Sequence, residues 1–178
     1  MAPMHLRGEM DFQTDDERIG FLANLVEEGS QNSTVREFTL NLLNQMKVDS
    51  YDRMGEITAI FKFVRDYFSY RNHVVGRDSF TTAQRTLQMY LDTGRGSGDC
   101  DNYAVLIASM LMAVGIQAAF RIMTTDPNQS YHHIYVLAGY HLGKKDEKWI
   151  PMDATNKSAK LGWEPRYADK RDYKIVIE

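Results

Sequence analysis

The single cysteine of the chain, Cys100, occupies a position that favours a reactive thiol. It follows Gly98 and Asp99 and begins a long apolar segment, so we expect it in the first turn of a buried helix. There, free backbone N–H groups and the positive end of the helix dipole lower the pKa of a thiol. Cys100 is therefore a candidate nucleophile. A small apolar core residue is the alternative, because free cysteines are often buried without a chemical role.

A nucleophilic thiol needs a base, and the base needs a partner that orients its ring. His133 begins the strand-like segment HIYVLAGY, and Asp153 ends the next one, WIPMD. Two adjacent antiparallel strands would bring this imidazole and this carboxylate together. The order cysteine, histidine, aspartate is that of papain-like thiol enzymes. His132 competes with His133, because neighbouring strand residues point to opposite faces and the pattern does not choose between them.

Metal and phosphate chemistry have weaker support in the sequence. A metal site from Cys100, His132 and His141 would lack the usual HxxxH or CxxC spacing. His73 and His141 lie in or beside loops and are expected at the surface. The segment TGRGSG follows no strand and precedes no Gly-Lys-Ser or Gly-Lys-Thr, so we interpret it as a hinge rather than a phosphate loop. We expect neither a metal nor a cofactor.

The composition predicts one globular domain. A chain of 178 residues that is 43% hydrophobic can bury one sizeable core.

One cysteine excludes an intramolecular disulfide and fits a reducing compartment. The net charge is −3 without a long block of like charge, so we expect no nucleic-acid or membrane partner. No apolar signal segment or membrane span is evident, which predicts a cytoplasmic protein. The oligomeric state stays open.

Two helices are expected near the N-terminus. Asp15 or Asp16 is suited to cap the first, whose apolar residues recur at helical spacing until Gly29, a candidate stop. Thr34 and Glu37 have the spacing of a capping box and predict the start of the second.

Three further helices are expected before the chain changes character. Apolar residues recur at helical spacing over residues 51–68, and a short helix is predicted over residues 82–91. The segment Cys100–Val114 is apolar on most of its circumference, so this helix is expected to be central and buried.

The second half of the chain predicts strands. Short β-rich segments alternate with turn residues, at Ala118–Met123, His133–Tyr140, Lys148–Met152 and Tyr173–Ile177. Helices first and sequential strands afterwards predict an α+β fold with an antiparallel sheet. We expect residues 1–48 to form a helical extension that packs on a core of residues 49–178, within one globular unit.

The segment around the cysteine, GDCDNYAVLIASMLMAVGIQAAFRIM, resembles the signature of the transglutaminase-like superfamily. In that signature Gly-Asp-Cys opens a helix, a glycine ends it and a strand follows. HIYV is similar to the histidine strand of the family, and WIPMDAT to its aspartate strand. IFKFVRDYFSY, TAQRTL and LGWEP extend the resemblance over about residues 50–166. These last features are most similar to small members encoded by tailed phages and prophages.

The resemblance implies a papain-like fold in which the helix bearing Cys100 packs on a sheet bearing His133 and Asp153. It selects His133 over His132, because the family histidine directly precedes an alternating strand. These three residues would then form a catalytic triad.

The resemblance also implies an oxyanion site, made by the backbone N–H of the nucleophile and an upstream side-chain donor. Tyr70 and Gln84 are the candidates, and we prefer Tyr70. The implied activity is hydrolysis of amide, peptide or isopeptide bonds in a peptide or protein substrate. The alternatives are acyl transfer to an amine, a phage assembly or virion protein that keeps the fold for binding, and a deglycosylating amidase with Trp163 and Tyr167 in its cleft.

Overall fold

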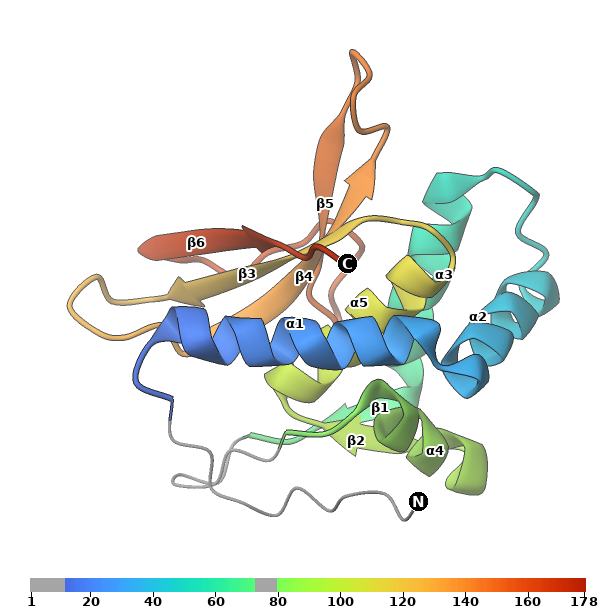
Figure 1. Cartoon of the computed structure of the whole chain (residues 1–178), viewed down its shortest axis with the longest axis horizontal. Coiled ribbons are helices and arrows are strands. Elements are labelled where there is room, and N and C mark those ends of the chain that lie inside the picture. The colour runs from blue at the N-terminus through green and yellow to red at the C-terminus, as the bar shows by residue number, and fades with distance from the viewer. Residues whose placement is uncertain (1–11, 73–79) are drawn as a thin grey trace.

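Helices and an antiparallel sheet form the described part of the protein, which in this computed structural model comprises residues 12–72 and 80–178 (Figure 1). The α+β class expected from the order of helical and strand-like segments is confirmed. The helices are α1 (Asp15–Gln31), α2 (Ser33–Gln45), α3 (Arg53–Tyr67), α4 (Ala83–Thr93) and α5 (Cys100–Ala113). The strands are β1 (Phe68–Tyr70), β2 (Gly96–Gly98), β3 (Ala118–Thr124), β4 (His133–Tyr140), β5 (Lys148–Met152) and β6 (Asp169–Lys174).

The main sheet has the antiparallel strand order β5-β4-β3-β6. Its register pairs Met123 of β3 with His133 of β4, and Val136 of β4 with Met152 of β5. The last strand covers residues 169–174 rather than the expected 173–177. It is an edge strand whose side chains are mostly exposed, so polar residues suffice and the apolar pattern used to locate strands is absent.

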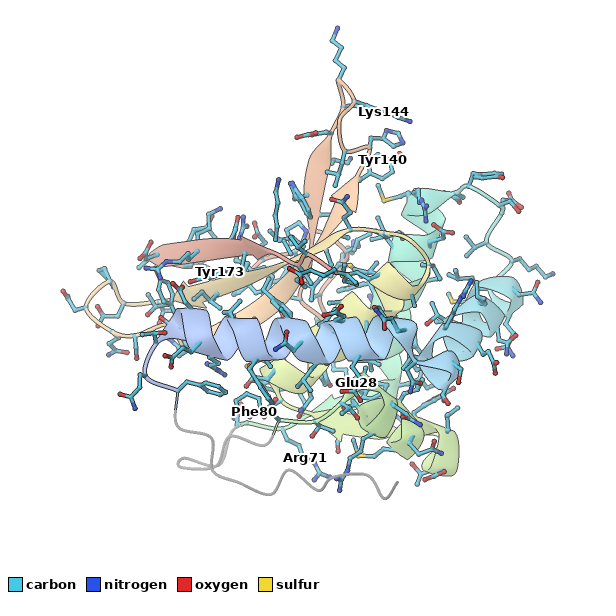
Figure 2. The ribbon with its side chains drawn as sticks, viewed as in Figure 1. Glu28, Arg71, Phe80, Tyr140, Lys144 and Tyr173 are labelled. Carbon is cyan, nitrogen blue, oxygen red and sulfur yellow. The ribbon has the colours of Figure 1, made fainter. Side chains whose placement is uncertain are left out.

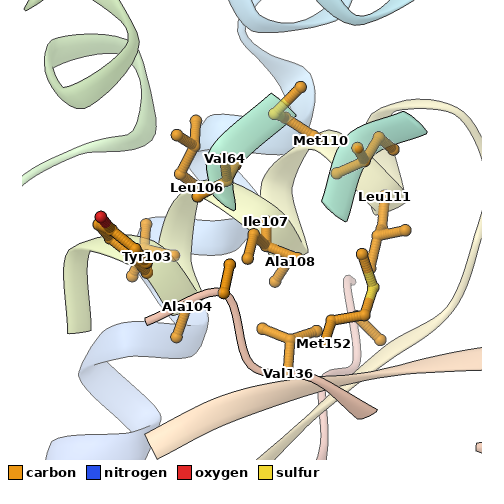
Figure 3. Packing of buried hydrophobic residues seen from close by; sticks show 14 of the residues in the cluster. Val64, Tyr103, Ala104, Leu106, Ile107, Ala108, Met110, Leu111, Val136 and Met152 are labelled. Atoms are coloured by element: carbon orange, nitrogen blue, oxygen red, sulfur yellow. The ribbon is translucent and has the colours of Figure 1, made fainter. Parts of the chain in front are cut away.

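Helix α5 lies at the centre of the core, as its apolar circumference predicts. It packs against α1, α2, α3, α4 and β4, and Figure 3 shows its side chains beside those of α3 and the sheet. Leu106, Ile107, Met110 and Leu111 are almost completely buried, and each such side chain stabilises the fold by about 1.5–3 kcal/mol. Because partners surround α5, its first residue has a rigid position.

Helix α1 begins and ends differently from the expectation. Its N-cap is Thr14, whose hydroxyl accepts a hydrogen bond from the Glu17 N–H, while Asp15 and Asp16 belong to the first turn. Gly29 lies inside the helix. A Cβ atom at Gly29 would come 2.3 Å from Oγ of Ser109 on α5, so this glycine permits close packing of two helices.

A single residue, Asn32, separates α1 from α2 and caps the second helix. Its side chain accepts a hydrogen bond from the Val35 N–H. The capping box expected from Thr34 and Glu37 is therefore wrong, because α2 begins at Ser33 and already includes Thr34. Asparagine is as good an N-cap as serine or threonine, and here it occupies the turn between the helices.

The glycine-rich segment after α4 is a short strand rather than a hinge. Gly96–Gly98 pairs in parallel with Phe68–Tyr70, and this pairing sets Tyr70 opposite Gly98. A Cβ atom at Gly96 would lie 2.1 Å from the ring of Phe68, so a residue without a side chain is required at that point. Tyr70, at the end of β1, therefore lies beside Gly98, which precedes Cys100 by two positions in the chain.

The β4–β5 hairpin extends away from the body of the protein, and Tyr140 and Lys144 mark it in Figure 2. Among the residues that the structure describes, no helix is both long enough and apolar enough to cross a membrane.

Candidate thiol active site

The first turn of α5 holds Cys100 in a well-defined environment. Asp99 is the N-cap, and its Oδ1 accepts a hydrogen bond from the Asn102 N–H at 3.0 Å. Oδ1 of Asn102 accepts one from the Asp99 N–H, also at 3.0 Å, which completes a capping box. Cys100 is the first residue of the helix and only 2% exposed. The helix dipole at this end favours negative charge on the sulfur.

His133 and Asp153 form a tight buried pair. Nε2 of His133 lies 2.7 Å from Oδ2 of Asp153, and the Asp153 side chain is 1% exposed. The other carboxylate oxygen accepts hydrogen bonds from the backbone N–H and the hydroxyl of Thr155, at 3.1 and 2.7 Å. The His133 ring also forms a hydrogen bond with Cys100. Because Nε2 is bound to Asp153, Nδ1 is the ring nitrogen that faces the sulfur.

The charges around His133 favour its protonated form. Burial lowers the pKa of the imidazole, but the hydrogen bonds to Asp153 and Cys100 and the charges of these two residues outweigh burial and raise it to about 9. An imidazolium beside a cysteine stabilises a thiolate. The arrangement therefore supports a thiolate–imidazolium pair at neutral pH.

Tyr70, at the end of β1, also contacts the sulfur. Burial raises the pKa of its hydroxyl far above the usual 10, and the negative charges of Cys100, Asp99 and Asp153 and a hydrogen bond to Cys100 act in the same direction. The hydroxyl thus stays protonated and can donate a hydrogen bond. The other oxyanion candidate, Gln84, is exposed on α4, where its amide oxygen accepts a hydrogen bond from Asn32.

Two basic side chains, which sequence reasoning missed, fasten the loop that follows β5 to the end of α3. Nζ of Lys157 donates to the backbone carbonyls of Arg65, at 2.6 Å, and of Phe68. The Arg65 guanidinium donates in return to the carbonyl of Ala159 at 2.9 Å. These bonds connect the loop after Asp153 to the strand that carries the candidate oxyanion donor. The partners are about 90 residues apart in the chain, so no local pattern signals them.

A third missed residue, Arg18 of α1, reaches the first turn of α5. Its Nη2 lies 2.8 and 2.6 Å from the two carboxylate oxygens of Asp101, the residue after Cys100. A small cavity between α1 and the sheet touches His133 and is lined by Asp15, Arg18, Ile19, Ile122, Tyr131, His133 and Ile134. Helix α1 therefore forms part of the surroundings of the candidate site.

The remaining histidines lie elsewhere or outside the described residues. His132 is exposed and precedes β4, whereas His141 lies beyond the strand and pairs through Nδ1 with Asp146 at 2.6 Å. His73 falls outside the residues that the structure describes. Within residues 12–72 and 80–178, no group of three or more His, Cys, Asp or Glu side chains is arranged to hold a metal ion.

The LGWEP segment anchors the C-terminal part of the chain on the sheet. Glu164 accepts a hydrogen bond from the Tyr135 hydroxyl at 2.9 Å and forms an ion pair with Arg121. Trp163 and Tyr167, the aromatic candidates for a sugar-binding cleft, are 38% and 39% exposed. The glutamate in this segment thus has a structural role.

Comparison with known proteins agrees with this architecture. The family model described as the transglutaminase-like superfamily matches residues 41–154, well over half of the chain. A crystal structure of a candidate protease from Parabacteroides distasonis is similar at a TM-score of 0.50 and 15% identity, over 66% of this chain. A candidate cysteine protease from Cytophaga hutchinsonii is similar at a TM-score of 0.50 and 15% identity, over 93% of this chain.

The two structural neighbours are longer proteins. This chain spans 23% of the Parabacteroides protein and 58% of the Cytophaga protein. At this identity the likeness concerns the fold alone. No curated protein sequence matches the chain.

Proposed function

Because this chain belongs to the transglutaminase-like superfamily, we propose that it is a thiol-dependent hydrolase of amide, peptide or isopeptide bonds, with Cys100, His133 and Asp153 as catalytic triad. The observation that carries the proposal is the 2.7 Å contact between His133 Nε2 and the buried Asp153 carboxylate, on a ring that also bonds to Cys100. A nucleophile, a base and an orienting group in hydrogen-bond contact are the elements of thiol catalysis.

In the first half of the proposed reaction, the Cys100 thiolate attacks the carbonyl carbon of the substrate and a tetrahedral oxyanion forms. The His133 imidazolium then gives its Nδ1 proton to the leaving nitrogen. The C–N bond breaks, the amine departs, and the acyl group remains on sulfur as a thioester. Asp153 keeps its hydrogen bond to Nε2–H throughout and holds the ring in one orientation.

In the second half, neutral His133 removes a proton from a water molecule as the water oxygen attacks the thioester carbonyl. The C–S bond breaks, the carboxylic acid product leaves, and the thiolate–imidazolium pair is restored. If a primary amine takes the place of water, the same steps give a new amide. This acyl transfer is the alternative outcome of the mechanism.

The proposed oxyanion site combines the backbone N–H of Cys100 with the hydroxyl of Tyr70. Two features support Tyr70: the hydroxyl hydrogen-bonds to the sulfur, and burial and nearby negative charge keep it protonated. A neutral donor next to the reacting atom can stabilise the charge that develops on the substrate oxygen.

Alkylation of the single cysteine tests the proposal directly. We expect iodoacetamide to label native Cys100 at about pH 6 faster than it labels a model thiol, because the paired thiolate persists there. His133→Ala should remove the excess. Since Cys100 is almost buried, the decisive comparison is between wild type and His133→Ala. The substitution removes a side chain that covers the sulfur, so slower labelling of the variant reports loss of the imidazolium and not loss of access. Equal rates in the two folded proteins would overturn the enzyme proposal in favour of a binding role.

Product analysis separates hydrolysis from transfer. The protein is incubated with casein and with cell-wall peptides, with and without a primary amine, and a Cys100→Ser variant serves as control. We expect cleaved or deamidated products that need Cys100 and contain no added amine. Formation of an amine conjugate would replace hydrolysis by acyl transfer.

The place of the chain within the superfamily is also a proposal. We infer that it belongs with the small phage- and prophage-encoded members and acts on a peptide or protein in the host cytoplasm. Fractionation of infected cells tests the location, and recovery with virions would contradict it.

Residues 1–48 are proposed as an extension that packs on a core of residues 49–178. One cooperative urea transition for the whole chain is expected, and two separate transitions would contradict a single unit.

A further inference from the structure

Two carboxylates flank the candidate nucleophile, one on each side in the sequence. Asp99 serves as the N-cap and Asp101 occupies the second position of α5. Both are buried, at 6% and 2% exposure. A buried negative charge next to a thiol disfavours the thiolate, because like charges repel strongly away from water. The site therefore needs positive charge near these residues.

Arg18 supplies such a charge from a distant part of the chain. Its guanidinium bonds to both oxygens of Asp101, at 2.8 and 2.6 Å, and its side chain is 25% exposed. Ion pairs of this kind are directional and resist solvent screening better than surface pairs. Arg18 also lines the small cavity that touches His133. The Arg18 side chain thus contacts the residue that follows the nucleophile and borders the same cavity as the base.

We propose that Arg18 is a positioning residue of this site: its ion pair with Asp101 offsets the negative charge beside Cys100 and fixes the first turn of α5 against α1. The inference rests on the proposed function. It assigns a role to α1, which lies outside the matched residues 41–154. Figure 1 shows α1 crossing in front of α5, with which it packs closely.

The thiolate responds to every charged or titratable group that faces it. Tyr70 from β1 and His133 from β4 bond to the sulfur, Asp99 caps the helix that begins with Cys100, and Asp153 lies behind His133. Asp101 follows Cys100 in α5 and is paired with Arg18 of α1. Removal of Arg18 leaves the carboxylates in place and takes away one cation. Its loss should therefore disfavour the thiolate, while loss of the Asp101 charge should favour it.

The test compares Arg18→Met, Asp101→Asn and the double variant, by the pH dependence of iodoacetamide labelling in folded protein. For Arg18→Met we expect about tenfold slower labelling at pH 6 and a midpoint about one pH unit higher. Asp101→Asn should label at least as fast as wild type. The double variant should return to within about threefold of wild type, because the charge that Arg18 offsets is then absent.

Arg171→Met is the matched control, since Arg171 is likewise an arginine that faces an aspartate. Its partner is Asp16 of α1, at 4.0 Å on the exposed surface. It should label like wild type. A purely structural role for Arg18 would lower the melting temperature without moving the midpoint, and that result would overturn the proposal. So would a double variant as slow as Arg18→Met.

Arg18→Lys covers the case in which Arg18→Met does not fold. It keeps the charge, so labelling at pH 6 should stay within about threefold of wild type and the midpoint should not move. A shift of one pH unit in folded Arg18→Lys would contradict the proposal. Failure of the proposed function gives a different result, because wild type itself would then label no faster than His133→Ala.

Discussion

Nε2 of His133 lies 2.7 Å from Oδ2 of Asp153, and the carboxylate is almost inaccessible to water. Thr155 occupies the other carboxylate oxygen with two hydrogen bonds. The imidazole is consequently held in one orientation, with Nδ1 directed to the sulfur. A rigid acceptor on a buried strand end is what a base needs to keep one tautomer through a reaction.

Replacement of Asp153 by Asn should disable the pair. The amide is neutral, so it stabilises the imidazolium less and lowers the pKa of His133. We expect labelling of Cys100 at pH 6 to fall at least tenfold and turnover of any identified substrate to fall by about 10²–10⁴. Asp146→Asn alters the exposed pair with His141 and should leave both rates unchanged. Normal labelling of folded Asp153→Asn would exclude a role for this carboxylate.

Stability should depend on pH through His133. Its pKa is about 9 in the folded protein and about 6.5 in an unfolded chain. Because the folded state binds the proton more tightly, this stabilisation is complete below pH 6.5 and is lost as pH rises through 9. The urea midpoint of wild type should exceed that of His133→Gln most at pH 6, and the difference should shrink by pH 10. A difference that grows with pH would contradict the charged pair.

Tyr70→Phe separates catalysis from thiol reactivity. Loss of one oxyanion donor should reduce turnover by about 10²–10³ while Cys100 still reacts with iodoacetamide. Tyr103→Phe is the matched control, because within the described residues its buried hydroxyl has no hydrogen-bond partner. This control should keep turnover and unfold at higher urea, by about 1 kcal/mol in the free energy of unfolding. Equal turnover of the two variants would remove Tyr70 from the oxyanion site.

Gly29→Ala should loosen the contact between α1 and α5. The new Cβ atom would lie 2.3 Å from Oγ of Ser109 and 2.8 Å from the Cβ atoms of Ser109 and Ala83, and both Cβ atoms are fixed to their backbones. We expect a loss of about 1–3 kcal/mol in the free energy of unfolding. Gly20→Ala, in the same helix but with nothing within 4 Å, should gain about 0.5–1 kcal/mol. Urea denaturation of both variants measures the contrast, which disappears if α1 does not pack as described.

The sequence alone determined the features that depend on neighbouring residues. The apolar circumference of α5 predicts its burial, because a helix without a polar face must be covered on all sides. Gly98, Asp99 and Cys100 place the thiol at a helix start through local capping chemistry. Short β-rich segments bounded by turn residues identify β3, β4 and β5. The α+β class follows from the order of these segments.

Only the tertiary structure decided the features that depend on distant residues. Arg18 reaches Asp101 across 83 positions, and Lys157 reaches Arg65 across 92, and such contacts leave no periodic pattern. The strand of Gly96–Gly98 has no apolar pattern either, because its glycines are required by the neighbouring ring of Phe68. Alternation along β4 did not choose between two adjacent histidines. The strand order and the family resemblance predict that His133 meets Asp153 and Cys100. The actual contacts of the ring depend on how the strand ends meet α5, which no local sequence pattern encodes.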